Sequence, residues 1–273
     1  MVCAPPPPSF LFFSSSTSHF FFILFIGGAY LAGSPRSHER LVSFLANASG
    51  SRALVLDYGL APENRWPRQL QDALAAYIFL LDACSVSPRN VVIMGDSAGG
   101  NLALVATVAM VQQEASGGRP ALEGLPVVPL KQGSSSILPG ALVLLSPWVA
   151  IDTKSAESLQ SSTWSKHADS DYLPSQELEA PARLFLPVGA PEELTRHPLV
   201  SPVFADPASV LSKFPKTLVS YGASEQLFGQ IDWFCRKFAH ANLDHPAKLK
   251  QLTYPGMPHV RIFHFLPPFF SSF

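Results

Sequence analysis

Short apolar runs alternate with amphipathic stretches along most of the chain. The apolar runs are bounded by glycine, proline or polar residues, which predicts buried strands over 20–25, 53–57, 91–94, 141–145, 217–221 and 248–254. Between them, apolar side chains recur every three or four residues, which predicts helices over 40–48, 70–81, 101–113 and 231–238. This alternation predicts an α/β fold with a mostly parallel, doubly wound sheet of about six strands, covered by helices on both faces.

Three segments lack the alternation. Residues 1–19 are rich in proline and serine and have the composition of low-complexity sequence, so we assign the folded domain to 20–273. Residues 115–139 are rich in glycine, proline and serine, which predicts a surface excursion. Residues 151–212 carry no strand signal and hold short helical pieces between prolines, so we expect a lid-like excursion there.

The uncharged segment from Phe20 to Ala32 has two interpretations. It is shorter than the roughly 20 residues of a membrane-spanning helix, and the first basic residue, Arg36, comes too late for an ordinary signal peptide. A short aromatic-rich run that stops at two glycines is typical of a central strand in a parallel sheet. We therefore expect a strand over 20–25, with a membrane anchor or an atypical signal as the alternative.

Composition and charge exclude several classes of protein. The 273 residues suit one α/β domain, and a net charge of −1 provides no basic field for nucleic acid. Hydrophobic residues make up 47%, which excludes disorder driven by charge. The three cysteines are odd in number and lack the spacing of metal ligands, which excludes a disulfide scaffold and favours a cytoplasmic location.

The strongest chemical signal joins the strand at 91–94 to the helix that follows it. Gly95, Ser97 and Gly99 form the pattern G-x-S-x-G. In this pattern the serine lies on a sharp strand-to-helix turn with its hydroxyl exposed, and the small neighbours let the two segments approach. The helix N-terminus also favours developing negative charge. We expect Ser97 to be a nucleophile; a helix N-cap in an ordinary glycine-rich turn is the alternative.

A nucleophilic serine needs a base and an acid that orients the base. In parallel sheets these residues lie beyond the carboxyl ends of the strands. Among the eight histidines, His259 follows the last predicted strand at that end. Glu225 is the only carboxylate between the strand at 217–221 and the next helix, and Asp232 inside that helix is the alternative acid. The pattern predicts a triad of Ser97, His259 and Glu225.

The same chemistry needs two backbone N–H groups that bind the oxyanion. One is expected from Ala98, directly after the nucleophile. The other is expected from Gly27 and Gly28, since glycine lets the backbone approach the substrate closely. No metal and no organic cofactor is implied.

Eight segments together resemble the hormone-sensitive-lipase-like branch of α/β hydrolases, the GDxG carboxylesterases. They are GGAYLAGSPRSH (27–38), LDYGLAPE (56–63), WPRQLQDALAAY (66–77), GDSAGG (95–100), LSPWV (145–149), SPVFAD (201–206), GASEQL (222–227) and YPGMPHV (254–260). The resemblance implies an α/β-hydrolase fold and the same assignments, with Ser97 as nucleophile, Glu225 as acid and His259 as base, and with Gly27, Gly28 and Ala98 as oxyanion donors. It also implies that Asp57, Tyr58 and Glu63 anchor a loop.

The front of the chain departs from the family pattern. The family has a histidine that braces the oxyanion loop before the two glycines, and Ile26 occupies that position. The family also has a cap and two strands ahead of this motif, whereas 19 low-complexity residues precede Phe20, so we expect the cap and the first strands to be missing. Residues 1–35 contain no charged side chain. We interpret residues 1–26 as a wrong or truncated start joined to a hydrolase body.

The resemblance implies hydrolysis of carboxylic esters of small to medium acyl groups through an acyl-enzyme, with a small-molecule ester as the partner. Amide hydrolysis, as in deacetylases of the same branch, is the neighbouring activity. Two readings from other classes remain as alternatives. One is a truncated or catalytically impaired member that binds a ligand or has no function, and the other is a membrane-anchored protein held through residues 10–32.

Overall fold

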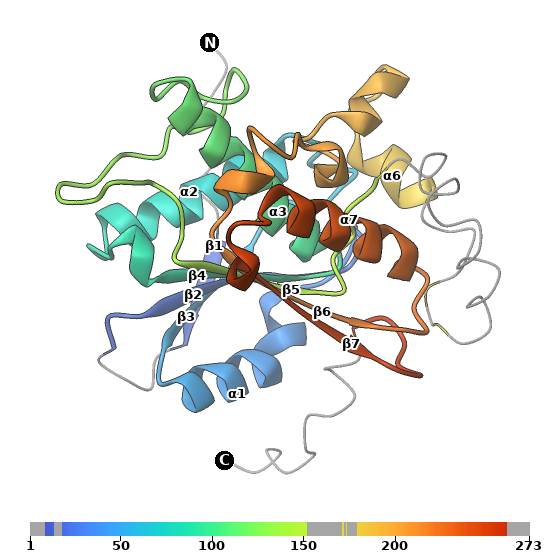
Figure 1. Ribbon diagram of the computed structural model, residues 1–273, viewed down its shortest axis with the longest axis horizontal. Helices are drawn as coiled ribbons and strands as arrows, with labels where there is room; N and C mark the ends of the chain where they lie inside the picture. Colours follow the sequence, from blue (N-terminus) through green and yellow to red (C-terminus); the bar gives the residue numbers. More distant parts are fainter. Residues whose placement is uncertain (1–8, 14–17, 152–170, 172, 174–178, 261–273) are drawn as a thin grey trace.

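Seven strands form one twisted sheet through the middle of the molecule (Figure 1). The computed structural model describes residues 9–13, 18–151, 171, 173 and 179–260. The strands lie in the order β1-β3-β2-β4-β5-β6-β7, and all neighbours are parallel except β1 and β3. Their bounds are β1 Ser9–Phe13, β2 Phe21–Phe25, β3 Arg52–Asp57, β4 Val91–Asp96, β5 Ala141–Leu145, β6 Lys216–Gly222 and β7 Leu249–Tyr254. The doubly wound, mostly parallel sheet is as predicted.

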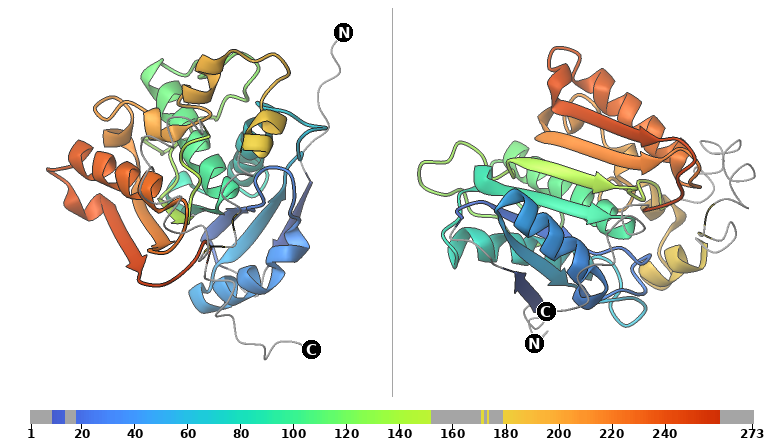
Figure 2. Two further views of the ribbon diagram at one scale, coloured as in Figure 1. Left: turned by 90° about the vertical axis from the view of Figure 1, so that its right-hand side faces the viewer. Right: turned by 90° about the horizontal axis from the view of Figure 1, so that it is seen from below.

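Helices cover both faces of the sheet (Figures 1 and 2). Helix α1 (Glu39–Ser49) lies on one face, and α2 (Arg68–Asp82), α3 (Ala98–Ala115) and α7 (Phe228–Ala241) lie on the other. These four helices confirm the four that the periodicity predicts. Helix α3 lies directly over the sheet and is buried along almost its whole length, because its apolar residues surround the helix rather than forming one stripe.

The edge strand β1 lies within residues 1–19, which the sequence analysis placed outside the folded domain. It pairs antiparallel with β3, from Ser9 opposite Asp57 to Phe13 opposite Ala53. Phe10 packs on Phe79 of α2 with 4.6 Å between the ring centroids. Its sequence, SFLFF, is an apolar run that suits a partly buried edge strand. The run was missed because proline and serine dominate the composition around it.

The uncharged segment after it forms the central strand β2. All five side chains of Phe21–Phe25 are buried, and the strand lies between β3 and β4. This confirms the predicted strand, and the anchoring helix of the alternative reading is wrong for these residues. Within the described part of the chain, every helix is too short or too polar to cross a membrane.

The two excursions differ in how much of them the structure describes. Residues 116–140 run without helix or strand, as predicted. Much of 151–212 lies outside the described residues; its described part includes helix α6 (Glu179–Phe185). This helix is held in two ways. Phe185 stacks on Tyr30 with 4.1 Å between the ring centroids, and Arg65 Nη1 donates to the carbonyls of Arg183, Leu184 and Leu186.

Candidate active site

Ser97 lies on the sharp turn between β4 and α3, with φ 50° and ψ −116°. A non-glycine residue at positive φ costs about 1–3 kcal/mol unless its surroundings hold it there. Here the Ser97 N–H donates to Leu145 O at 2.9 Å, and the Trp148 N–H donates to Ser97 O at 2.9 Å. The Ser97 side chain makes no capping hydrogen bond within the described residues. Ser97 therefore occupies the N-cap position of α3 without capping it through its side chain, which leaves the hydroxyl available for the expected role as a nucleophile.

The two glycines of the motif let α3 lie against the sheet. A Cβ on Gly95 would come within 2.1 Å of Gly99 O, and a Cβ on Gly99 within 1.9 Å of Phe25 O. Neither approach is compatible with a real side chain. Strand register explains the second contact, because Phe25 of β2 lies opposite Gly95 of β4. The same register places the turn that follows β2 beside Ser97.

We expect Gly99→Ala to lower the free energy of unfolding by about 3 kcal/mol, because the added methyl group would push α3 away from the backbone of β2. Gly117→Ala is the matched control, since it lies just past the same helix and its Cβ would meet nothing within 4 Å. The control costs about 1 kcal/mol, through its positive φ alone. Denaturant unfolding measures both variants, and equal losses would contradict the packing argument.

Glu225 lies just beyond β6 and is fully buried. Its Oε2 accepts hydrogen bonds from Ser146 Oγ at 2.6 Å and from the Gly222 N–H at 2.9 Å. Its Oε1 lies 3.6 Å from Nδ1 of His259. The two bonds to one oxygen fix the carboxylate, so that its other oxygen faces the imidazole.

His259 lies beyond β7 and is 1% exposed. The turn that carries it is held against the end of β6, where the Ser224 N–H donates to Met257 O at 3.1 Å. A Cβ on Gly222 would come within 2.0 Å of the same oxygen, so this close approach depends on a glycine. The loops that carry Glu225 and His259 are therefore packed directly on each other.

Ser146 is a residue of this site to which the sequence analysis gave no role. It follows β5, is buried, and has φ 45°. Its hydroxyl donates to Glu225 and accepts the Val260 N–H at 3.1 Å, so it joins the acid loop to the residue after His259. Its position offered a signal, because it is a polar residue at the carboxyl end of the strand between β4 and β6.

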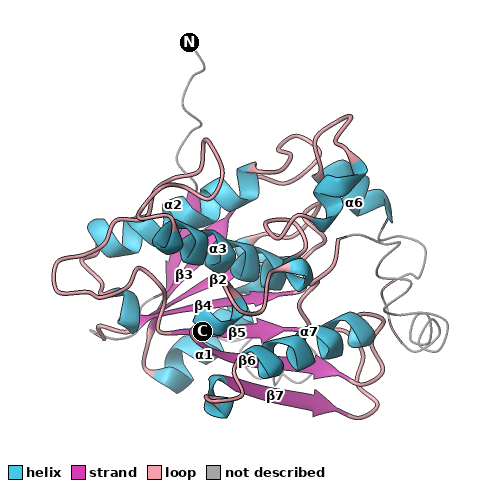
Figure 3. Cartoon of the chain, turned by 45° about the horizontal axis from the view of Figure 1, so that its top comes forward, coloured by secondary structure: helices cyan, strands magenta, loops and turns pink. Residues whose placement is uncertain are grey.

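The carboxyl ends of the parallel strands β4, β6 and β7 lie at the same end of the sheet (Figure 3), and a candidate residue follows each of these strands. Ser97 follows β4, Glu225 follows β6 and His259 follows β7. Glu225 Oε1 and His259 Nδ1 face each other at 3.6 Å. The Ser97 N–H donates to Leu145 O, and the next residue, Ser146, donates to Glu225. The alternative acid, Asp232, lies inside α7 and pairs with Arg236.

The turn after β2 corrects one predicted oxyanion donor. The Gly27 N–H donates to Asp96 Oδ1 at 3.0 Å, so it is directed at a carboxylate and not at a substrate. Gly28 follows with φ 121°, where a Cβ would come within 2.2 Å of Ala32 O. Ala98 is the first residue of α3, where backbone N–H groups lack a partner inside the helix. Of the three predicted donors, Gly28 and Ala98 remain candidates.

Other side chains brace this turn at the position where the family pattern has histidine. The Tyr58 hydroxyl donates to Ile26 O at 2.6 Å. Burial, and next the Asp96 carboxylate, raise the pKa of Tyr58, which keeps the phenol protonated as a donor. His38 Nε2 lies 3.0 Å from Asp96 Oδ1, the oxygen that holds Gly27. The expected anchoring role of Tyr58 is confirmed, whereas its two companions in that expectation, Asp57 and Glu63, are exposed.

We expect Asp96→Ala to lower the free energy of unfolding by about 1–3 kcal/mol, because the buried Gly27 N–H loses its acceptor. Asp57→Ala is the control, because Asp57 is an exposed carboxylate at the end of β3 and its loss changes stability by less than about 0.5 kcal/mol. Denaturant unfolding compares the two, and a control that loses as much as Asp96→Ala would show that Asp96 is not a brace.

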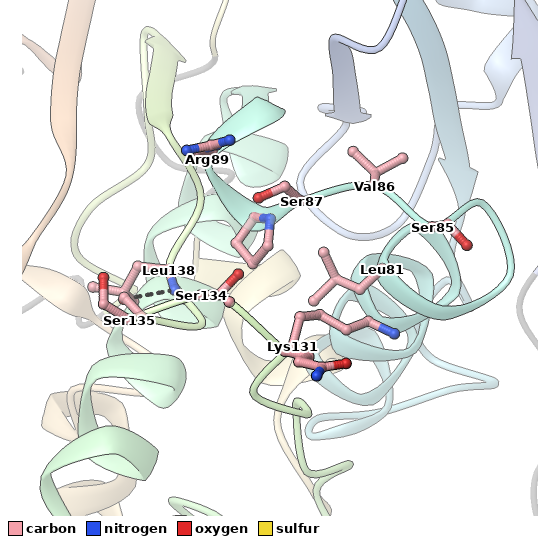
Figure 4. Close-up of a pocket in the computed structure, with 13 residues that line it drawn as sticks. Leu81, Ser85, Val86, Ser87, Arg89, Lys131, Ser134, Ser135 and Leu138 are labelled. Carbon is pink, nitrogen blue, oxygen red and sulfur yellow. Dashed lines mark hydrogen bonds between the residues drawn. The ribbon is translucent and has the colours of Figure 1, made fainter.

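A polar cavity of about 680 Å³ lies elsewhere in the molecule (Figure 4). Its lining includes Ser87 and Arg89 ahead of β4, and Lys131 and Ser134 in the excursion ahead of β5. These segments lead into the amino ends of β4 and β5, whereas Ser97 follows the carboxyl end of β4. The cavity and Ser97 therefore lie at opposite ends of the strands. The described residues contain no cluster of three or more histidine, cysteine, aspartate or glutamate side chains that could hold a metal ion.

Comparisons with known proteins agree with the fold described above. A family model described as alpha/beta hydrolase fold matches residues 22–263. An acetyl-hydrolase of Streptomyces hygroscopicus is 34% identical over 201 residues, which cover 74% of this chain and 56% of the relative. An esterase of Acinetobacter venetianus is 31% identical over 232 residues, which cover 85% of this chain and 64% of the relative. The chain thus spans less than two thirds of the length of either relative.

A solved structure is similar over nearly the whole chain. The crystal structure of a hormone-sensitive lipase from a metagenome library has a TM-score of 0.69 and 31% sequence identity. The match covers 90% of this chain and 70% of that one.

Proposed function

The chain belongs to the alpha/beta hydrolase fold family, and on that premise we propose that it hydrolyses carboxylic esters with Ser97 as its nucleophile. The family model, the acetyl-hydrolase relative and the solved lipase structure confirm the resemblance drawn from the sequence motifs. The observation that carries the proposal is the buried pair of Glu225 and His259, held at the edge of the sheet where Ser97 lies on a strained turn. This set supplies a nucleophile, a base and an orienting acid.

The proposed reaction proceeds through an acyl-enzyme. His259 takes the proton of the Ser97 hydroxyl as the oxygen attacks the ester carbonyl, and Glu225 stabilises the imidazolium. The backbone N–H groups of Gly28 and Ala98 bind the oxyanion. The alcohol leaves with the proton from His259. Water then gives a proton to His259, attacks the acyl carbonyl and releases the acid, and the proton returns to Ser97.

The proposed substrates are esters of small to medium acyl groups. The name of the Streptomyces relative, acetyl-hydrolase, supports the small end of this range. The test compares p-nitrophenyl acetate, butyrate, octanoate and laurate as substrates of the full chain. Higher kcat/KM for acetate or butyrate than for laurate supports the proposal, and the highest value for laurate would contradict the acyl range.

The second candidate is a family member that binds ligand without turnover. Ile26 favours it, because the family pattern has a bracing histidine there. The contacts of Tyr58 with Ile26 and of Asp96 with Gly27 weigh against it, since they hold the same turn by other means. Saturable binding of an ester with no release of p-nitrophenol would favour this second candidate.

A further inference from the structure

Asp171 contacts both loops of the proposed acid–base pair. Its Oδ2 accepts the backbone N–H of Gln226 at 2.7 Å, and its Oδ1 accepts the backbone N–H of His259 at 3.1 Å. Gln226 is the residue after Glu225, so each oxygen of one carboxylate holds one of the two loops. Asp171 comes from the excursion at 151–212, in which the sequence analysis named no site residue.

A second contact fixes the segment of Asp171 against the acid loop. The side chain of Gln226 is buried and its Nε2 donates to Leu173 O. Gln226 is therefore contacted twice, at its backbone N–H by Asp171 and at its side chain by Leu173. Its hold on His259 is at the backbone, which leaves the imidazole to face Glu225.

We propose that Asp171 is a positioning residue that sets the separation of Glu225 and His259 by holding the backbone of both loops. This inference rests on the proposed function. Oε1 of Glu225 and Nδ1 of His259 are 3.6 Å apart, slightly beyond hydrogen-bond distance, so a small drift of either loop would separate them. A shift of about 1 Å at such a site costs roughly 100-fold in rate. The chain passes through α7 between β6 and β7, so the loops that follow these two strands are not continuous with each other. Asp171 opposes the drift because it is hydrogen-bonded to both loops.

The test measures kcat and KM for p-nitrophenyl acetate in Asp171→Asn, Asp171→Glu and Asp206→Asn. The amide of Asp171→Asn places a donor opposite one of the two N–H groups and releases one loop. We expect kcat to fall about 10- to 100-fold while KM changes less than about 2-fold. Asp206→Asn is the matched control, because Asp206 also accepts a backbone N–H, from Ser209 at 2.7 Å, in a loop without a catalytic residue. Its kinetics should equal those of the unmodified protein.

Asp171→Glu separates position from charge. It keeps the charge and both acceptor oxygens but moves them by one methylene, so its kcat should lie between those of the unmodified protein and Asp171→Asn. A kcat of Asp171→Asn within about 2-fold of the unmodified protein would overturn the proposal. If Asp171→Asn does not fold, Asp171→Glu decides alone, and an unchanged kcat in that variant overturns the proposal.

A spectroscopic measurement keeps this inference distinct from the proposed function. The downfield proton resonance of His259 Nδ1–H reports its contact with Glu225, whether or not an ester is hydrolysed. We expect it to move in Asp171→Asn and to stay in place in Asp206→Asn. If Ser97→Ala hydrolyses esters as fast as the unmodified protein, the proposed function fails. The resonance then decides the role of Asp171, and an unmoved resonance overturns it.

Discussion

Ser97→Ala is expected to lower kcat for p-nitrophenyl acetate by about 10⁴-fold or more, because the variant has no nucleophile for the acyl-enzyme. The fold should be retained. The contacts that hold the turn, to Leu145 O and from the Trp148 N–H, are made by the backbone of residue 97 and remain in the variant. Melting temperatures of the two proteins should therefore agree closely while their rates differ.

The control for this variant is Ser209→Ala, which removes an exposed hydroxyl from the loop ahead of β6, at the other edge of the sheet. Its rate should match that of the unmodified protein. A fluorophosphonate probe adds a second measurement, because it should label the peptide that contains Ser97 and fail to label Ser97→Ala. Equal rates in Ser97→Ala and the unmodified protein would sink the proposed mechanism.

Glu225→Gln is expected to lower kcat by about 10⁴-fold with KM nearly unchanged. Glutamine fills the same volume and keeps one oxygen for Ser146 Oγ and the Gly222 N–H, so the loop stays in place. Its amide nitrogen then faces Nδ1 of His259, which favours the tautomer that cannot serve as base at the other ring nitrogen. The loss is therefore in the chemical step and not in binding.

Asp232→Asn is the control for the acid, because Asp232 is the other carboxylate that the sequence offered for this role. It pairs with Arg236 within α7, and breaking an exposed pair of this kind costs little. We expect its kcat to change by less than about 2-fold. A larger loss in Asp232→Asn than in Glu225→Gln would transfer the role of the acid to Asp232.

The succession of strands and helices along the chain could be predicted because each element has its own local pattern of apolar residues. The strand-to-helix turn at Ser97 could be predicted for the same reason, since Gly95, Ser97 and Gly99 lie within five residues and their spacing determines the geometry of the turn. Strand β1 was missed because five apolar residues lie in a segment whose prolines and serines dominate its composition. Its antiparallel partner, β3, is about 40 residues away.

The contacts that complete the site are long-range and leave little trace in sequence. The Gly27 N–H was predicted to face the substrate, but it faces the carboxylate of Asp96, 69 residues away. Asp171 reaches His259 across 88 residues, and Ser146 reaches Glu225 across 79. Asp96 and Ser146 could be noticed only by their position at a strand end, and Asp171, in the excursion at 151–212, has no such signal.

Helix α6 packs beside the turn that carries Gly28, through the contact of Phe185 with Tyr30. The Tyr30 ring that stacks on Phe185 also donates from its hydroxyl to Asn101 Oδ1 at 2.7 Å, and Asn101 lies in the first turn of α3. Moving α6 outward would strip three carbonyls from Arg65 and pull on Tyr30, two residues from Gly28. A displacement of α6 would therefore be transmitted through Tyr30 to the turn of Gly28, whose N–H group the proposed mechanism uses to bind the oxyanion.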